Sequence, residues 1–296
     1  MNKDQLLKFY EQGYRDFTGV DLRKVDLSGV MLIGVDLTGA NLIGANLSRA
    51  FLTKSNLSQA ALNWADLSFA KMSDVKLNLA DLTKANLSGA FMVKANLEEA
   101  KLSGANFSHT NLRASNLCRA NVCGAKLQKV NLREACLNQA NFTWADLQDG
   151  RLTGAQLENV SFTGVNLSQT WLVDVDLSGS NLEGINLKRA KLTRANLSNT
   201  NLSNANLAEA QLRGGNLDNA NLTKAKLVNA DLRGASLTQA NLSNADLTQA
   251  NLSDANLKLA ILYNTILEAT LETAEFLLPQ TRINQSSYGN QQIQIA

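Results

Sequence analysis

The sequence predicts an all-β protein built as a solenoid, and three observations lead to that fold class. A large apolar residue falls at every fifth position from Phe17 to Leu267, which gives 51 consecutive units, 44 of them centred on Leu. The residue two places before each centre is small, and it is usually Ala. The other positions are mostly polar, so a unit reads small, polar, large, polar, polar. Such a fixed period is the mark of a repeat architecture.

A period of five residues suits neither a helix nor a straight strand. On an α-helix, successive centres would be rotated by about 140° beyond a full turn, so they would form no apolar stripe. In a straight strand, the small residue and the centre would share one face, but the next pair would point to the opposite face. Both pairs point inward if the chain turns once per unit. Each unit then forms one short side of a coil.

The units resemble those of the pentapeptide-repeat family, whose repeat is A(D/N)LXX. Examples are Ala40-Asn41-Leu42, Ala85-Asn86-Leu87 and Ala195-Asn196-Leu197. The lead-in from Leu6 to Phe17 also resembles that of cyanobacterial members. This resemblance implies a right-handed quadrilateral parallel β-solenoid with four units per coil, and therefore about 13 coils for the 51 units.

The repeat also sets the expected domain organisation. Residues 1–14 are expected to form a capping helix, with Asn2 at its N-cap and Gly13 after its end, because the end of a solenoid must be covered. Residues 15–269 are expected to form the solenoid. Glu272 stands where the next centre would fall, so residues 270–281 are expected to form a C-terminal cap. Residues 282–296 are rich in Gln, Asn and Ser and are expected to be disordered.

Turns are expected at the end of each unit, where glycine is frequent. Gly29, Gly34 and Gly39 occupy the last position of their units, which suits a turn that needs a positive φ. Many other units have Lys, Asn, Gln or Arg at that position. We therefore expect turns of mixed type.

Composition and the rare residue types indicate no metal or cofactor. The net charge is +2, which shows no strong bias toward binding or mimicking a polyanion. Cys118, Cys123 and Cys136 are few, odd in number and without metal-site spacing, so we expect surface thiols at outward positions. The N-terminus shows no apolar run of the length of a signal peptide or membrane span. A cytoplasmic protein without a membrane partner is expected.

The abundant Asp, Asn, Ser and Thr residues do not indicate catalysis, because the repeat places them at its outward positions. A convex solenoid without inserted loops offers no cleft that excludes water, as most catalysis requires. We therefore expect no enzyme activity and no small-molecule substrate. The expected oligomeric state is a monomer, or a weak dimer through one end of the solenoid.

One face of the coil differs from the others in charge and in apolar content. Sorted by position in a coil of 20 residues, the side centred on Leu32, Leu52 and Met72 has ten basic and five acidic outward residues, a net charge of +5. It also carries apolar residues where other sides have Asn or Asp. The candidate partner-binding residues are Met31, Ile33, Phe51, Lys54, Lys71, Phe91, Val93, Lys94 and Trp171. Alternatively, these residues are scattered, or the N-terminal helix covers them.

These observations favour a non-catalytic scaffold that binds an unknown protein partner through one solenoid face, in a role that includes regulation. A first alternative is topoisomerase (gyrase) inhibition by DNA mimicry, as the resemblance to quinolone-resistance members implies. Those members are acidic, whereas this chain has a net charge of +2. A second alternative is weak nucleic-acid binding on the basic face, which the interspersed acidic residues disfavour.

Overall fold

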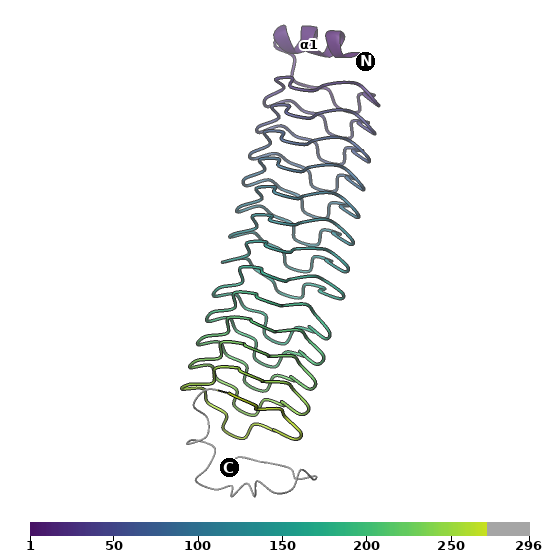
Figure 1. Cartoon of the computed structure of the whole chain (residues 1–296). Helices are drawn as coiled ribbons and strands as arrows, with labels where there is room; N and C mark the ends of the chain where they lie inside the picture. Colours follow the sequence, from purple (N-terminus) through teal and green to yellow (C-terminus); the bar gives the residue numbers. More distant parts are fainter. Residues whose placement is uncertain (271–296) are drawn as a thin grey trace, which may run out of the picture. The chain divides into compact units, whose positions relative to one another are not determined.

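The computed structural model describes residues 1–270, and an α-helix opens the chain (Figure 1). Helix α1 spans Lys3–Glu11. Asn2 caps it, because its side chain accepts a hydrogen bond from the Gln5 amide while the Gln5 side chain accepts one from the Asn2 amide. Leu6 is fully buried, and the N-terminal amino group donates to the carbonyl of Asp21. In the described part of the chain, no helix combines the length and apolar character needed to cross a membrane.

After the helix, residues 20 positions apart pair in parallel, so each coil consists of four sides of five residues. Asp36 pairs with Asp16 in the coil before it and with Asn56 in the coil after it. The Asp36 amide donates to the carbonyl of Arg15 at 2.7 Å, and the Leu37 amide donates to the carbonyl of Asn56 at 2.7 Å. Within residues 1–270 these pairings are isolated bridges between single residues, which makes each side of the coil short.

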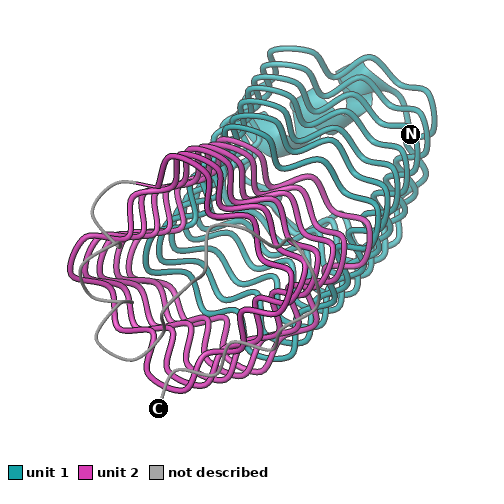
Figure 2. Cartoon of the chain, turned by 60° about the horizontal axis from the view of Figure 1, so that its bottom comes forward, with its two compact units in different colours: residues 1–161 teal, residues 162–296 magenta. Residues whose placement is uncertain are grey.

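The chain divides into two compact units, unit 1 at Met1–Ser161 and unit 2 at Phe162–Ala296 (Figure 2). Both units are built from coils with the same register. A single solenoid over residues 15–269 stays a prediction. Beyond Thr270, the expected C-terminal cap and the expected tail lie outside the described residues.

The core of each unit is made of the large centres and the small residues two places before them. Leu137 in unit 1 and Leu212 in unit 2 are fully buried, and so are the small residues Ala135 and Ala210. Burial of each Leu side chain contributes roughly 1.5–3 kcal/mol. The three other positions of a unit are half-buried or exposed in most units. The expected alternation of inward and outward positions is therefore confirmed in both units.

The turns between sides share one backbone conformation at their third residue. The Ala40 amide donates to the carbonyl of Leu37 at 3.0 Å, which closes a four-residue turn. The third residue of each turn from Gly19 to Ala269 has a positive φ, even where a long side chain stands, as at Lys54 with a φ of 59°. A positive φ at that position alone is the pattern of a type II turn. The expectation of mixed turn types is wrong, because the register between coils sets the turn whichever residue occupies it.

The Asn or Asp before a centre forms hydrogen bonds that stabilise the fold. Oδ1 of Asn46 accepts a hydrogen bond from the Ser48 amide at 3.0 Å, and Nδ2 of Asn46 donates to Oδ1 of Asp26 in the preceding coil at 2.9 Å. Asn201 of unit 2 makes the same two kinds of contact. These side chains therefore form ladders that support the turns and join neighbouring coils. An apolar residue at this position gives up both contacts.

Candidate functional site

Four residues of unit 1 replace the polar ladder on one column of coils. Parallel bridges connect them in the order Met31, Phe51, Lys71 and Phe91. The side chains of Met31, Phe51 and Phe91 are 57%, 40% and 41% exposed. Neighbouring coils are about 4.8 Å apart, so these side chains form one continuous strip. The strip residues cannot form the ladder hydrogen bonds of Asn or Asp, and they expose apolar surface to water. Neither the turn nor the core requires apolar residues at these positions.

The other candidate residues of unit 1 lie on the same side of the coil as this strip. Ile33 and Val93 directly follow their centres, and Ile33 is exposed while Val93 is half-buried. Lys54 and Lys94 stand at the third position of their turns, with φ values of 59° and 57°, and both are exposed. The last candidate, Trp171, belongs to unit 2.

Helix α1 ends beside the first coil of this face. The Tyr10 hydroxyl donates to the carbonyl of Ile33 at 3.3 Å. The guanidinium of Arg15 lies 3.9 Å from the Tyr10 ring centroid and donates to the Tyr10 carbonyl, which holds this end of the helix. Met31 and Phe51 nevertheless stay exposed. The alternative that the N-terminal helix covers them is therefore wrong.

Two further residues, Arg49 and Phe69, complete a groove that the sequence analysis missed. The groove has a volume of about 440 Å³ and is lined by Gly29, Arg49, Phe51, Phe69 and Lys71; we call it the unit 1 groove. Sorting residues by their centres assigned Phe69 and Lys71 to different sides of the coil. They are only two residues apart and flank the buried Ala70, so both point outward at one corner. That spacing was the signal that could have revealed the groove.

Phe69 owes its position to a glycine in the next coil. A Cβ atom at Gly89 would lie 2.6 Å from Cε1 of Phe69, so a side chain there would collide with the ring. The ring therefore lies across the backbone of Gly89 and is still 57% exposed. On the neighbouring column, Nζ of Lys71 lies 5.7 Å from the Phe91 ring centroid, within cation–π range. Both side chains lean toward the following coil.

The cations of this face and of the unit 1 groove differ in whether they form an ion pair with a carboxylate. Nη2 of Arg113 lies 2.9 Å from Oε1 of Glu134. No ion pair joins Arg49, Lys54 or Lys71 to a carboxylate within residues 1–270. The cations around the unit 1 groove thus keep their charge available to a ligand.

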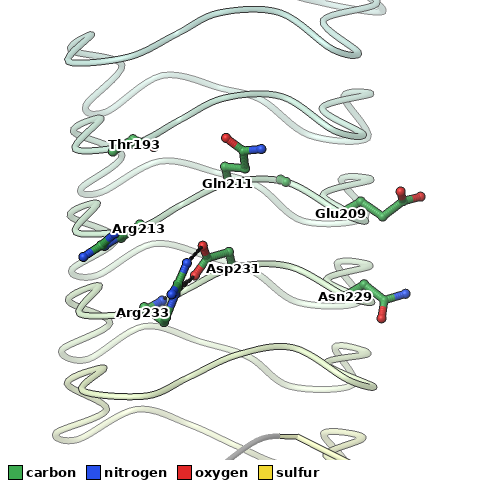
Figure 3. Close-up of a pocket in the computed structure, with 8 residues that line it drawn as sticks. Thr193, Glu209, Gln211, Arg213, Asn229, Asp231 and Arg233 are labelled. Carbon is green, nitrogen blue, oxygen red and sulfur yellow. Dashed lines mark hydrogen bonds and ion pairs between the residues drawn. The ribbon is translucent and has the colours of Figure 1, made fainter.

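Unit 2 has a polar pocket at overlapping positions of the coil (Figure 3). This unit 2 pocket has a volume of about 520 Å³, and its lining includes Glu209, Gln211, Arg213, Asn229, Asp231 and Arg233. Nη2 of Arg233 donates to Oδ2 of Asp231 at 2.7 Å, and these hydrogen bonds hold the pKa of the Asp231 carboxyl below its ordinary value. Trp171 of unit 2 is paired too, because Nζ of Lys191 lies 3.3 Å from its ring centroid.

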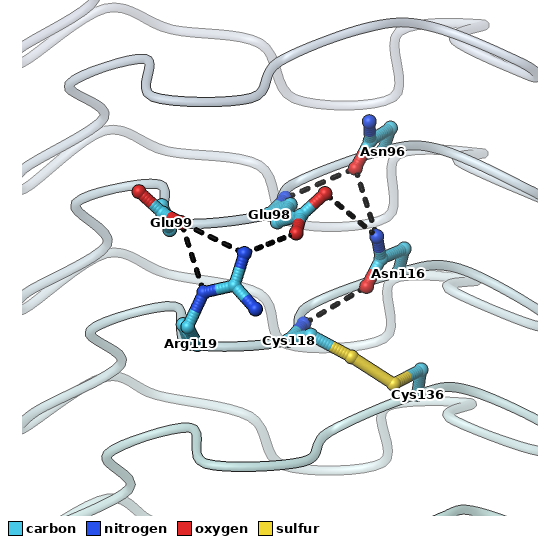
Figure 4. Close-up of polar contacts among 7 residues, drawn as sticks. All are labelled: Asn96, Glu98, Glu99, Asn116, Cys118, Arg119 and Cys136. Carbon is cyan, nitrogen blue, oxygen red and sulfur yellow. Dashed lines mark hydrogen bonds and ion pairs between the residues drawn. A yellow bond between two sulfur atoms is a disulfide. The ribbon is translucent and has the colours of Figure 1, made fainter.

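Cys118 and Cys136 form a disulfide between neighbouring coils of unit 1 (Figure 4). Their Cα atoms are 5.7 Å apart, and 18 residues separate them in sequence. The expectation that all three cysteines are plain surface thiols is therefore wrong for this pair. Only Cys123 is a free thiol within residues 1–270. Beside the disulfide, the Arg119 guanidinium contacts the carboxylates of Glu98 and Glu99.

The polar side chains of the described residues do not gather into a metal site. Among residues 1–270 no group of three or more His, Cys, Asp or Glu side chains is placed to hold a metal ion. Outward Asn and Asp side chains are instead engaged by the turns and ladders, as Asn46 shows. The arrangement offers binding surface: an apolar, cation-lined groove in unit 1 and a polar pocket in unit 2.

The sequence profile of a known family, described as pentapeptide repeats, matches eight copies along the chain. The matched residues are 21–59, 60–98, 80–117, 105–143, 140–179, 172–207, 200–239 and 240–270. No curated protein matches the sequence.

Solved structures of pentapeptide repeat proteins are also similar to the chain. HetL from the cyanobacterium Nostoc sp. strain PCC 7120, which is involved in heterocyst differentiation regulation, is 33% identical over 89% of this chain and 98% of its own, with a TM-score of 0.23. A thylakoid lumen protein of Arabidopsis thaliana is 31% identical over 33% of this chain and 68% of its own, with a TM-score of 0.33. QnrB1, a plasmid-mediated fluoroquinolone resistance protein, is 18% identical over 58% of this chain and 91% of its own, with a TM-score of 0.35.

Proposed function

We propose that this chain, which belongs to the pentapeptide repeat family, is a non-catalytic scaffold that binds a partner protein and acts in regulation. The binding surface is the face of unit 1 that holds the strip from Met31 to Phe91. Its residues are Met31, Ile33, Phe51, Lys54, Lys71, Phe91, Val93 and Lys94. Trp171 of unit 2 is a separate contact in this proposal.

The observation that carries the proposal is the exposed strip itself. At the position before the centre, other units have Asn or Asp, and these side chains form ladder hydrogen bonds, as Asn46 and Asn201 do. The solenoid therefore does not require Phe51 or Phe91 at this position. Aromatic and long apolar side chains beside cations are the residue types that dominate protein–protein interfaces. A protein partner that covers the strip removes this apolar surface from water.

The charge of the same face opposes DNA mimicry. A DNA mimic needs dense negative charge, whereas the net charge of the chain is +2, and Lys54 and Lys71 form no ion pair within the described residues. A non-catalytic role agrees with the use of outward Asn and Asp side chains in ladders. Monomeric behaviour, or weak dimerisation through a solenoid end, is part of the proposal.

A cytoplasmic location is also part of the proposal, and the disulfide makes it testable. Cytosolic reductants keep most thiols reduced, whereas oxidising compartments preserve disulfides. In the cytoplasm we expect Cys118 and Cys136 to be reduced. Alkylation of intact cells before lysis, followed by peptide mass spectrometry, reads their state directly. A pair that is fully oxidised in intact cells would argue for an oxidising compartment.

The proposed function is tested by affinity capture from an extract of the source organism. The bait is compared with a Met31→Ser/Phe51→Ser/Phe91→Ser variant. These side chains are exposed, so we expect an unchanged melting temperature and loss of the captured protein. The matched control is Trp64→Ser/Leu79→Ser, which removes two exposed apolar side chains at other corners of unit 1. Retention of the partner by the first variant, or loss by the control, would contradict the assignment of this face.

A further inference from the structure

We infer that the unit 1 groove binds an extended acidic peptide segment that carries one bulky apolar side chain. This inference rests on the proposed function and names the chemistry of the partner. The apolar side chain inserts between Phe51 and Phe69, and flanking carboxylates of the peptide pair with Arg49 and Lys71.

The two phenyl rings define the apolar part of the groove. Phe51 and Phe69 belong to successive coils and stand on opposite sides of one corner. Phe69 is 57% exposed and holds a φ of 57°, a backbone conformation that disfavours every residue with a Cβ atom. Gly29 and Gly89 occupy the same position in nearby coils without that strain. Part of the Phe69 ring packs over Gly89, and the exposed remainder is available to a ligand.

The two cations define the charged part of the groove. Arg49 and Lys71 lie on the opposite diagonal of the same corner, so each coil contributes one cation and one phenyl ring. No carboxylate within residues 1–270 forms an ion pair with either of them. Some cations at other coils are paired, as Arg194 is with Asp174 at 2.7 Å, whereas Lys94, Arg133 and Arg151 also have no ion pair within residues 1–270. In this inference, carboxylates of the bound peptide pair with these two cations.

The size of the groove matches one side chain and the backbone beside it. A volume of about 440 Å³ falls within the range of roughly 300–1,000 Å³ that is common for ligand pockets. In an extended peptide, alternate side chains point to opposite faces and neighbours on one face are about 7 Å apart. One anchor can therefore enter the groove while acidic residues beside it reach the cations at its two edges.

The carboxylate of Asp74 favours a short peptide over a nucleic acid. Asp74 is exposed, and its turn position is the one that Lys54 and Lys94 hold in the coils before and after it. A phosphate backbone that runs along this face would meet that charge, and it gains affinity only by neutralising several phosphates. A peptide with an acidic residue on each side of its anchor needs only Arg49 and Lys71.

The inference is tested by selecting from a displayed library of random short peptides on the full chain. We expect enriched sequences with Asp or Glu on both sides of one aromatic or aliphatic residue. The winning peptide is then labelled, and its affinity is measured by fluorescence anisotropy. Raising the ionic strength should weaken its binding, because salt screens the charge pairs.

Matched variants locate the binding site of the winning peptide. We expect Phe51→Ser/Phe69→Ser and Arg49→Glu/Lys71→Glu each to weaken binding roughly tenfold or more. The apolar control Trp64→Ser/Leu79→Ser and the charge control Lys24→Glu/Lys126→Glu should change the affinity less than twofold. Melting temperatures verify that all four variants are folded.

Several results would overturn the inference. The first two are the absence of any enriched peptide and the enrichment of neutral or basic peptides. The third is an affinity of the winning peptide that is the same for the groove variants as for the wild type. The fourth is tighter binding of labelled oligothymidine than of the winning peptide. The proposed function has its own readout, because capture of a cellular partner depends on Met31 and Phe91 as well. If the strip variant loses that partner while no acidic peptide is selected, the proposed function stands and this inference fails.

Discussion

The unit 1 groove and the unit 2 pocket share two positions of the coil but carry different side chains at both. In unit 1 those positions hold two phenyl rings and two cations without ion-pair partners. In unit 2 they hold Glu209, Gln211, Asn229 and Asp231. Asp231 is paired with Arg233, and Glu209 is paired with Arg189 at 2.7 Å. The unit 1 groove therefore exposes unpaired cations and apolar rings, whereas most charged side chains of the unit 2 pocket form ion pairs within the protein.

The backbones of the two regions are the same, which shows where the difference arises. The Phe51 amide donates to the coil before it at 2.8 Å, and the Gln211 amide does so at 2.9 Å. Phe69 and Glu209, at the third position of their turns, have φ values of 57° and 60°. The repeat therefore sets the backbone, and the outward side chains alone decide what each coil binds.

The largest effect is expected from charges placed in the core, and it tests whether the two units have equivalent interiors. We expect Leu137→Asp in unit 1 and Leu212→Asp in unit 2 each to lower the free energy of unfolding by about 4 kcal/mol or more, because an unpaired carboxylate would be buried. Asn138→Asp, at an outward position, is the control and should change it little. Denaturant unfolding measures all three variants. Tolerance of either core variant would show that the two interiors differ.

A smaller effect is expected from the disulfide, a feature of unit 1. Linking Cys118 to Cys136 closes a short loop, which stabilises a fold by roughly 2–4 kcal/mol. A reducing agent should therefore lower the melting temperature of the wild type and leave that of Cys136→Ser unchanged. Cys123→Ser should behave like the wild type. An identical melting temperature with and without reductant would show that the disulfide does not stabilise unit 1.

The turn backbone can be tested with a pair of opposite substitutions. Gly124 and Ala114 have φ values of 64° and 55° at the same turn position, and a Cβ atom at Gly124 would meet no atom within 4 Å. We expect Gly124→Ala to lower the free energy of unfolding by about 1 kcal/mol and Ala114→Gly to raise it by a similar amount. The reason is that a Cβ atom disfavours the left-handed backbone conformation, whereas glycine adopts it readily. Effects of equal sign would contradict a uniform turn.

The smallest effect is a pH dependence that comes from the first coils of unit 1. Hydrogen bonds from the Thr38 hydroxyl and amide lower the pKa of Asp36 below its ordinary value of 3.8. A lowered folded-state pKa stabilises the protein above the ordinary value, and this stability is lost as the pH falls through the folded-state pKa. Asp36→Asn keeps the acceptor but cannot titrate, so its stability should fall less in acid. Thr38→Val should also flatten the acid limb. If the free energy of unfolding falls equally with pH in acid for the wild type and both variants, the lowered pKa of Asp36 is not the cause.

The interior was predictable from the sequence because a single rule repeats along the chain. Leu137 is buried and Asn138 faces outward because each stands at a fixed place in its unit. The capping pattern at Asn2 likewise indicated the helix at Lys3–Glu11. The turn form was not predictable from residue type, because contacts between coils force a positive φ even on residues such as Phe69.

The groove and the disulfide were missed for different geometric reasons. Sorting residues by their own centre separates neighbours that meet at a corner, as Phe69 and Lys71 do. Residues 18 apart, in contrast, lie on one side of the coil, and they meet because one follows a centre and the other precedes the stacked centre of the next coil. Cys118 and Cys136 are related in this way, and their outward positions and spacing were already visible in the sequence.

The most direct test of the central claim is to move the groove from unit 1 to unit 2. In a Phe51→Ser/Phe69→Ser background, the groove residues and the two glycines that flank them are installed at equivalent coil positions. The substitutions are Arg189→Gly, Glu209→Arg, Gln211→Phe, Asn229→Phe, Asp231→Lys and Gln249→Gly. The measurement is the affinity of the selected acidic peptide for this folded variant. We predict that binding returns to within about tenfold of the wild type, because the coil backbone is the same in both units. A folded graft that does not bind the peptide would contradict the claim that outward side chains on a uniform backbone decide recognition.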